Sequence, residues 1–144
     1  MKKAPTHRLA DRVLWALGRA SQQSQRLVRQ HMTQAGVRTQ HYHVLASLAD
    51  DGEAAQATLA DRIGFDRSDL VTLLDELEEL KFLARRVDPA DRRRKIVAIT
   101  PAGEKQLDSM DQLIYAAEAD LLEPLTATER KTLLALLRRL SADQ

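Results

Sequence analysis

The sequence predicts a mainly α-helical protein with one small β element of two or three strands. Apolar residues recur at helical spacing through most of the chain, and several of these stretches begin with residues that cap helices. Two short β-prone runs, residues 82–87 and 95–99, flank a charged turn. The 144 residues include two Phe, two Tyr and one Trp, so we expect one domain with a core built mainly from Leu, Ala and Val.

The composition narrows the class of protein. Lys and Arg number 22 against 21 Asp and Glu, so the net charge of +1 indicates no partner by itself. The absence of Cys excludes disulfides and thiol catalysis and fits a reducing compartment. No apolar run approaches the length of a membrane span, and the N-terminus lacks the apolar stretch of a secretion signal. We therefore expect a cytoplasmic protein with no membrane partner.

Residues 8–34 predict one long amphipathic helix, because this stretch holds no Pro and a single Gly. At about 1.5 Å per residue such a helix is roughly 40 Å long, whereas a domain of this size has a radius of gyration of about 15 Å. The helix would overhang one compact domain, which indicates that a second chain covers it. Its apolar stripe consists of Leu9, Val13, Leu17, Ala20, Leu27 and His31.

Three shorter helices are predicted next. The first begins at Thr39, a candidate N-cap, and ends at residues 50–52. The second covers residues 57–63. The third has Asp66 as its N-cap and runs to about Leu80.

The second and third of these helices have the spacing of a helix-turn-helix. Ala60 is small where the helices cross, Gly64 tolerates the positive φ of a tight turn, and Leu70 packs back from the second helix. The expected buried face of that helix is Leu70, Leu73, Leu74, Leu77 and Leu80. The other face carries Arg67, Ser68, Val71, Thr72 and Asp75. Residues so placed on a recognition helix contact base edges in the major groove, and a solvated helix surface is the alternative.

The turn between the two β runs carries four consecutive cations, Arg92 to Lys95. Charge runs of this kind are often only solvated. A hairpin directly after a helix-turn-helix, however, predicts a winged helix, whose wing tip reaches the minor groove or the phosphates beside it. Asp91 is expected to orient a neighbouring guanidinium through paired hydrogen bonds. The candidate DNA-binding residues are Arg67, Ser68, Thr72, Arg85, Asp91, Arg92, Arg93, Arg94 and Lys95.

The rest of the chain predicts two further helices. Thr100 is a candidate N-cap followed by Pro at the first helical position, and this helix is expected to run to about Leu122. Thr126 and Glu129 have the spacing of a capping box, which predicts a last helix through Leu140.

The segment DPADRRRKIVAITPAG, residues 88–103, resembles the wing motif of the MarR family of bacterial transcriptional regulators, which is D-x-R, an apolar strand and then L-T-x-x-G. The order of the elements resembles that family over nearly the whole chain. The resemblance implies that Asp91 and Arg93 are the D-x-R pair and that Arg93 enters the minor groove. It places Ile99, Thr100 and Gly103 at the end of the motif. Asp66 and Asp69 depart from the pattern by adding negative charge at the tip of the recognition helix.

The resemblance also implies a homodimer formed through the first and last helices. Residues 1–35 and 101–144 would then be a helical dimerisation region, and residues 36–100 a winged helix-turn-helix DNA-binding domain. The expected function is a sequence-specific transcriptional regulator, a repressor that binds a pseudo-palindromic operator and is released by a small aromatic anion. The alternative is a winged-helix protein-interaction module without specific DNA binding. Cations at the wing tip favour DNA, whereas Asp69 and Asp75 favour the alternative.

An effector site is expected near Trp15, because MarR-like proteins often lose DNA affinity when a small aromatic molecule binds. Trp15 lies opposite the apolar stripe of its helix, on the side that carries Arg8, Arg12, Arg19 and Arg26. An indole beside guanidinium groups suits an aromatic acid, although a Trp packed on a partner chain would follow the same pattern. The candidate ligand-binding residues are Trp15, Arg19 and His43.

No cofactor, metal or catalytic activity is expected. His41 and His43 are two residues apart, so on a helix they diverge by about 200° and cannot share a metal ion. The sequence also lacks a nucleophile with an adjacent base and a phosphate-binding glycine loop. The chain is therefore not expected to be an enzyme.

Overall fold

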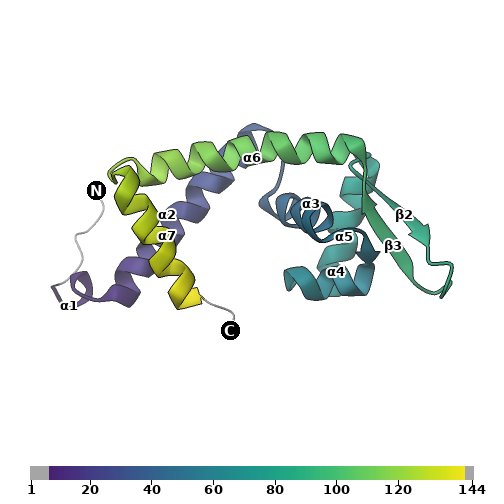
Figure 1. Ribbon diagram of the computed structural model, residues 1–144, viewed down its shortest axis with the longest axis horizontal. Helices are drawn as coiled ribbons and strands as arrows, with labels where there is room; N and C mark the ends of the chain where they lie inside the picture. The colour runs from purple at the N-terminus through teal and green to yellow at the C-terminus, as the bar shows by residue number, and fades with distance from the viewer. Residues whose placement is uncertain (1–6, 142–144) are drawn as a thin grey trace.

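A computed structural model describes residues 7–141 of the chain. The molecule is elongated, with a helical lobe at one end, a mixed lobe at the other and one long helix that spans both (Figure 1). In chain order the elements are α1 (His7–Ala10), α2 (Val13–Gln34), α3 (Thr39–Asp51), β1 (Ala54–Ala55), α4 (Gln56–Ile63), α5 (Arg67–Glu79), β2 (Leu83–Val87), β3 (Lys95–Ile99), α6 (Pro101–Leu122) and α7 (Ala127–Ser141). The mainly helical fold class with a small β element is confirmed.

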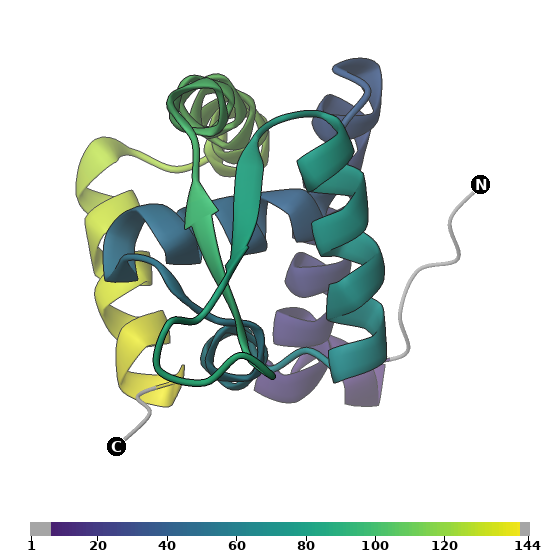
Figure 2. The same cartoon turned by 90° about the vertical axis from the view of Figure 1, so that its right-hand side faces the viewer.

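The sheet has three antiparallel strands in the order β1-β3-β2. The hairpin of β2 and β3 pairs Leu83 with Ile99, and β1 adds Ala54 opposite Val97. The sequence did not locate β1, because two Ala residues are too short a run to show an alternating pattern. Figure 2, viewed from the end that carries the hairpin, shows α5 running beside it and α6 end-on.

Capping residues set several helix ends as predicted. Gly64 ends α4 in the left-handed conformation, at φ 71°. Asp66 caps α5, and its carboxylate accepts from the Ser68 amide at 3.5 Å. At the start of α7, the Thr126 amide donates to Glu129 at 2.9 Å, and the Glu129 amide donates to Thr126 Oγ1 at 3.2 Å. The predicted capping box is therefore confirmed.

The start of α6 is fixed by close packing of its backbone against the residues just before β2. Thr100 Oγ1 accepts from the Gly103 amide at 3.0 Å and donates to the Lys81 carbonyl at 2.7 Å. The Thr100 amide donates to the Phe82 carbonyl at 3.1 Å. A Cβ on Gly103 would lie 1.9 Å from that same carbonyl oxygen. Position 103 therefore requires Gly, which explains the T-x-x-G spacing.

Two predicted helix starts are wrong. The chain is not one helix from residue 8 to 34, because Arg12 is extended (φ −100°, ψ 124°) and separates α1 from α2. The short α1 has no buried residue, so no packing within the chain favours a continuous helix there. Thr39 is not an N-cap but the first residue of α3. The N-cap position is Arg38, whose guanidinium binds Glu76 on α5 at 2.9 Å and has no capping role.

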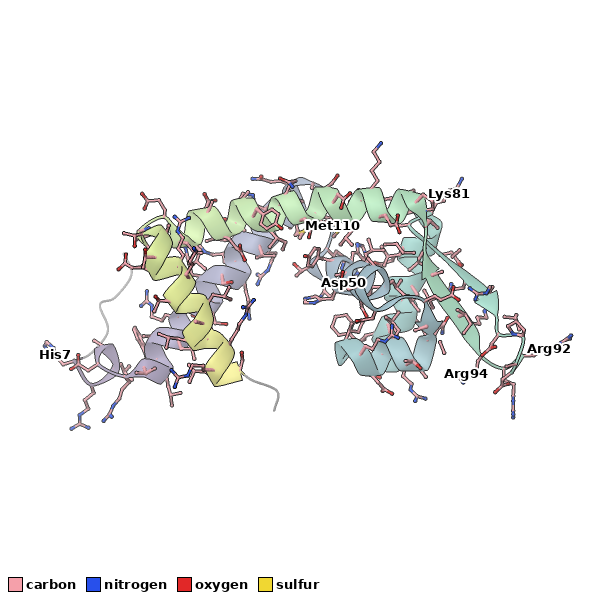
Figure 3. The ribbon with its side chains drawn as sticks, in the orientation of Figure 1. His7, Asp50, Lys81, Arg92, Arg94 and Met110 are labelled. Atoms are coloured by element: carbon pink, nitrogen blue, oxygen red, sulfur yellow. The ribbon has the colours of Figure 1, made fainter. Side chains whose placement is uncertain are left out.

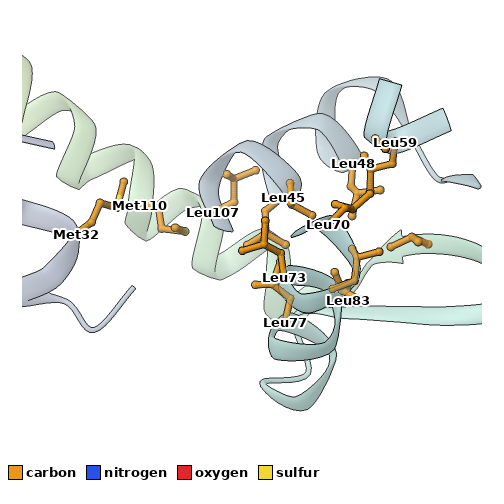
Figure 4. Close-up of a cluster of buried hydrophobic side chains, with 14 residues drawn as sticks. Met32, Leu45, Leu48, Leu59, Leu70, Leu73, Leu77, Leu83, Leu107 and Met110 are labelled. Atoms are coloured by element: carbon orange, nitrogen blue, oxygen red, sulfur yellow. The ribbon is translucent and has the colours of Figure 1, made fainter. Parts of the chain in front are cut away.

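The hydrophobic core lies in the mixed lobe (Figure 4). Four Leu of α5 are buried as predicted, namely Leu70, Leu73, Leu74 and Leu77. Leu80 is not part of this face and is 51% exposed. The physical reason is that Leu80 caps α5 just before Lys81, whose positive φ of 66° turns the chain away. Met32 of α2 and Met110 of α6 are buried at the edge of the core toward the helical lobe.

The helical lobe leaves its apolar residues uncovered within one chain. Helix α7 has no buried residue, and Met32 is the only one in α2. Several large apolar side chains of this lobe are exposed, including Leu9, Val13, Leu14, Leu17, Leu134, Leu137 and Leu140. Residues 1–6 and 142–144, which also belong to the predicted dimerisation region, lie outside the described range. Among the helices of residues 7–141, none is long and apolar enough to cross a membrane.

Helix α6 also makes polar contacts with both lobes. The Tyr42 hydroxyl of α3 donates to Asp111 at 2.7 Å, and His31 of α2 lies 3.0 Å from Asp120. The hydrogen bond to Asp111 raises the pKa of Tyr42 to about 12, so the phenol stays protonated and donates over the physiological pH range. These contacts fix α6 relative to α2 and α3.

Candidate nucleic-acid interface

Helix α5 presents a polar face on the side opposite its buried leucines. Burial of one face against the core leaves the other outside, at helical spacing. The exposed residues of this face are Arg67, Ser68, Val71, Thr72 and Asp75. The predicted division of α5 into a core face and an outer face is confirmed, while contact of the outer face with DNA stays a prediction.

The end of the hairpin is a tight turn with exposed cations. The Asp88 amide donates to the Arg94 carbonyl and the Arg94 amide to the Asp91 carbonyl, both at 2.9 Å. Figure 3 shows Arg92 and Arg94 projecting from this turn at the far end of the molecule. The side chain of Arg93 is 93% exposed. Within residues 7–141, the only ion pair of these three side chains is the one between Arg93 and Asp91.

Asp91 contacts Arg93 differently from the predicted paired hydrogen bonds. A single oxygen, Oδ1, accepts from the Arg93 amide at 3.0 Å and lies 3.5 Å from Arg93 Nε. The shorter contact goes to the backbone because the two residues share one turn, where the amide already faces the carboxylate. Asp91 therefore shapes the turn and leaves the outer nitrogens of Arg93 unengaged.

Arg85 points inward from β2, unlike the cations of the turn. Its side chain is 14% exposed, and Nη2 lies 2.6 Å from Asp75 and 3.0 Å from Glu78, both on α5. Nη1 donates to Gln56 of α4 at 3.4 Å. The hydrogen bond from Arg85 lowers the pKa of Glu78, and the same bond raises the pKa of Arg85. Arg85 thus ties the hairpin to α4 and α5 and offsets part of the negative charge of α5. Its contact with DNA stays a prediction.

A cleft of about 560 Å³ separates α5 from the hairpin. Among the predicted DNA-binding residues, Arg67, Arg85, Arg93, Arg94 and Lys95 line this cleft together. Thr72 faces a different hollow, on the other side of α5, beside Asp66 and Asp69. The cleft also contains Val71 and Gln56, which were not among the candidates. The exposed position of Val71 on α5 could have indicated that it lines the cleft. No local sequence pattern indicates that Gln56 does.

The predicted ligand residues do not form one site. Trp15 and Arg19 come together, with the guanidinium carbon 4.9 Å from the centre of the indole, in a cleft of about 890 Å³ lined by α2 alone. His43 instead lines a cleft of about 600 Å³ between α2 and α3, with Arg29 and Phe65. The reason is distance along α2: α3 packs near Met32, roughly 25 Å from Trp15 at about 1.5 Å per residue.

His41 and His43, two residues apart in the sequence, have separate environments. His41 is 6% exposed, with Nε2 2.7 Å from Glu76, whereas His43 is exposed and packs edge-on against Phe65. Within residues 7–141, no three His, Asp or Glu side chains gather closely enough to hold a metal ion.

The helix pair α4–α5 followed by the β2–β3 hairpin defines a winged helix-turn-helix protein. The family model of the MarR family matches residues 35–94. A protein of Thauera aromatica, described as a transcriptional regulatory protein for the hcr operon, is 34% identical over 108 residues, which are 75% of this chain and 65% of that protein. The chain thus spans about 65% of the length of this relative. The chain is therefore similar in sequence to members of the MarR family.

Solved structures show the same fold over nearly the full chain. MarR of E. coli superposes with a TM-score of 0.79 at 23% identity, covering 98% of this chain and 99% of that one. BpsR of Bordetella bronchiseptica gives a TM-score of 0.78 at 26% identity and covers 98% of this chain and 100% of its own. The DNA binding of BpsR is regulated by 6-hydroxynicotinic acid.

Replacing Arg85 by Met should lower the free energy of unfolding by about 2 kcal/mol, because Asp75 and Glu78 lose their hydrogen-bonded cation. The pKa of Glu78 is lowered in the folded protein, so its contribution is present above the ordinary glutamate pKa of about 4.3 and is lost as the pH falls through the lowered value. The difference between wild type and variant should therefore shrink below about pH 4. Urea unfolding of wild type and variant at neutral and acidic pH measures this difference in the free energy of unfolding.

Arg86→Met is the matched control, since Arg86 pairs with Glu53 at 2.7 Å but both side chains are 52% exposed. Its effect on stability should be small at every pH. Equal losses in the two variants would contradict the role assigned to Arg85.

Proposed function

We propose that this protein is a sequence-specific DNA-binding transcriptional regulator. The observation that carries the proposal is the cleft in which Arg67 of α5 faces Arg93, Arg94 and Lys95 of the wing. Helix α5 would enter the major groove by its N-terminal end, and the wing would reach the neighbouring minor groove, where the potential is most negative. The regulation of BpsR DNA binding supports the same role.

The alternative, a winged-helix protein-interaction module, rested on the acidic residues of α5. Asp75 lies 2.6 Å from Arg85, a cation that it shares with Glu78, so it repels phosphates less than an isolated charge would. Asp69 is exposed and forms no such ion pair within residues 7–141, so it still favours the protein-interaction module. The balance of charge at the cleft favours DNA.

We also propose that the chain acts as a homodimer through residues 1–35 and 101–144. The apolar side chains left exposed on α2 and α7 need a partner, and a second copy offers the same surface. An apolar cleft of about 530 Å³ between α6 and α7, lined by Leu121, Leu134 and Leu137 among others, could receive side chains of that copy. A two-fold dimer implies a pseudo-palindromic operator with half-sites about 10 bp apart.

The proposed mode of action is repression relieved by a small aromatic anion. BpsR supports this because its regulating ligand, 6-hydroxynicotinic acid, is an aromatic acid. Two clefts contain both an aromatic side chain and an arginine. Arg19 lies over Trp15 in one, and Phe65 and Arg29 line the other. Such pairs suit an aromatic carboxylate through stacking and charge-assisted hydrogen bonds.

Arg93→Ala and Arg67→Ala should weaken DNA binding in different ways. Loss of Arg93 should weaken binding to every duplex and lower the salt slope by about 0.9 for each phosphate that the variant no longer neutralises. Loss of Arg67 should cost about 1–3 kcal/mol at one base pair and leave nonspecific affinity nearly unchanged. Binding isotherms on operator and scrambled duplex at several salt concentrations separate the two effects.

Lys105→Ala is the control for these variants, because Lys105 is an exposed cation on α6, outside the cleft. It should bind as wild type does. If Arg93→Ala also left affinity and salt slope unchanged, the cations of the wing would be only a solvated turn.

Leu134→Glu should convert the dimer to a monomer, because it places a charge in the proposed interface. The control is Leu80→Glu, since Leu134 and Leu80 are 50% and 51% exposed and Leu80 lies in the other lobe. Light scattering at micromolar concentration should give a dimer for wild type and the Leu80 variant. A folded monomer for the wild-type chain would reject the homodimer.

Titration with 6-hydroxynicotinate should quench the single Trp if the ligand binds in the α2 cleft, and Arg19→Ala should weaken that quenching. The ligand would instead bind in the cleft between α2 and α3 if it released DNA without quenching Trp15 and if His43→Ala abolished that release. Unchanged fluorescence and DNA affinity with this and related aromatic acids would reject the effector.

A further inference from the structure

The outer face of α5 has fewer free polar groups than its sequence suggests. The Ser68 hydroxyl donates to Asp66 at 3.2 Å, and the Thr72 hydroxyl lies 3.4 Å from the Ser68 carbonyl. Each hydroxyl has one hydrogen to donate, so both are engaged within the helix. Asp75 is held by Arg85 at 2.6 Å. The two remaining side chains of this face are Arg67 and Val71.

Val71 occupies a position that the stability of the protein does not explain. It is 41% exposed, while the four buried leucines of α5 already contact the core. A β-branched residue also has lower helix propensity than Ala or a straight-chain residue, so an exposed Val weakens the helix slightly. Val71 lies one turn after Arg67 on the same side and lines the same cleft.

We propose that Val71 is a specificity-determining residue that recognises a thymine in the operator through its 5-methyl group. The major groove offers one apolar group, the methyl of thymine, while its other distinguishing groups are hydrogen-bond donors and acceptors. Val71 is the exposed large apolar side chain of a cleft that also holds Arg67, Arg93 and Arg94. The other apolar residues of the lining are buried or small, namely Leu70, Ala55 and Ala57. One exposed apolar side chain among cations fits one methyl within a polyanion. A protein partner would need a wider apolar surface than a single Val provides.

The geometry also relates this thymine to a second base. Arg67 is the first residue of α5, where a guanidinium can bind O6 and N7 of a guanine. Val71 lies about one helical turn further, which places its Cβ about 5–6 Å from that of Arg67, and base pairs are stacked about 3.4 Å apart. The thymine should therefore lie about one or two base pairs from the guanine. This inference rests on the proposed function.

The test replaces single thymines by uracil, which removes the methyl and keeps every hydrogen-bonding group. Operator sequences are first selected from random duplexes with the wild-type chain. At one thymine in each half-site, uracil should weaken wild-type binding about fourfold, the equivalent of one buried methyl. Val71→Ala should bind the two duplexes equally, while Arg67→Ala should keep the difference.

The variant is expected to fold, because Ala at an exposed helix position raises helix propensity; circular dichroism and thermal unfolding check this. Val71→Ile, which keeps the methyl contact, should retain the uracil effect. If uracil has no effect at any position while wild type still prefers the operator over scrambled duplex, the role of Val71 is overturned and the proposed function stands. A uracil effect that persists in Val71→Ala also overturns the role of Val71. If the wild-type chain selects and prefers no duplex, both the role of Val71 and the proposed function are rejected.

Discussion

The position of α6 depends on one close contact, the approach of the Gly103 backbone to the carbonyl oxygen of Phe82. A Cβ at residue 103 would lie 1.9 Å from that oxygen, so a larger residue would force α6 away from the sheet. Helix α6 runs unbroken from Pro101 to Leu122 and packs against both α3 and α2, so displacement at its start would move one lobe relative to the other. In a dimer built on the helical lobe, the distance between the two α5 helices would follow from this contact.

The basic residues of the β2–β3 hairpin divide into two groups, those paired with carboxylates of other elements and those of the exposed turn. Arg85 and Arg86 of β2 are paired with carboxylates on neighbouring elements, at 2.6 Å and 2.7 Å. Arg92, Arg93 and Arg94 lie in the exposed turn. Arg85 offsets part of the negative charge of α5, and Arg86 pairs with Glu53, so these carboxylates do not draw on the cations of the turn near the cleft. A protein with a net charge of +1 can therefore present a strongly positive local surface.

Most features that the sequence predicts correctly depend on neighbours in the chain, although the break at Arg12 and the start of α3 were missed. The ends of α4, α5, α6 and α7 follow from Gly64, Asp66, Thr100 and the Thr126 capping box, each acting within one turn. Features that depend on distant segments were missed. The inward direction of Arg85 requires α5 beside β2, β1 exists only because β3 pairs with it, and His43 is separated from Trp15 by where α3 packs on α2.

The contacts of α3 with α5 bear on how a ligand could change DNA binding. Arg38 and His41 both bind Glu76 of α5, at 2.9 Å and 2.7 Å, and the hydrogen bond from His41 is the main cause of the lowered pKa of Glu76. Arg38 also lines the cleft between α2 and α3, so a carboxylate bound there would compete with Glu76 for its guanidinium. A ligand in the Trp15 cleft touches α2 alone and could act on α5 only by changing the dimer. A ligand in the α2–α3 cleft could therefore act on α5 of the same chain directly, through Arg38 and Glu76.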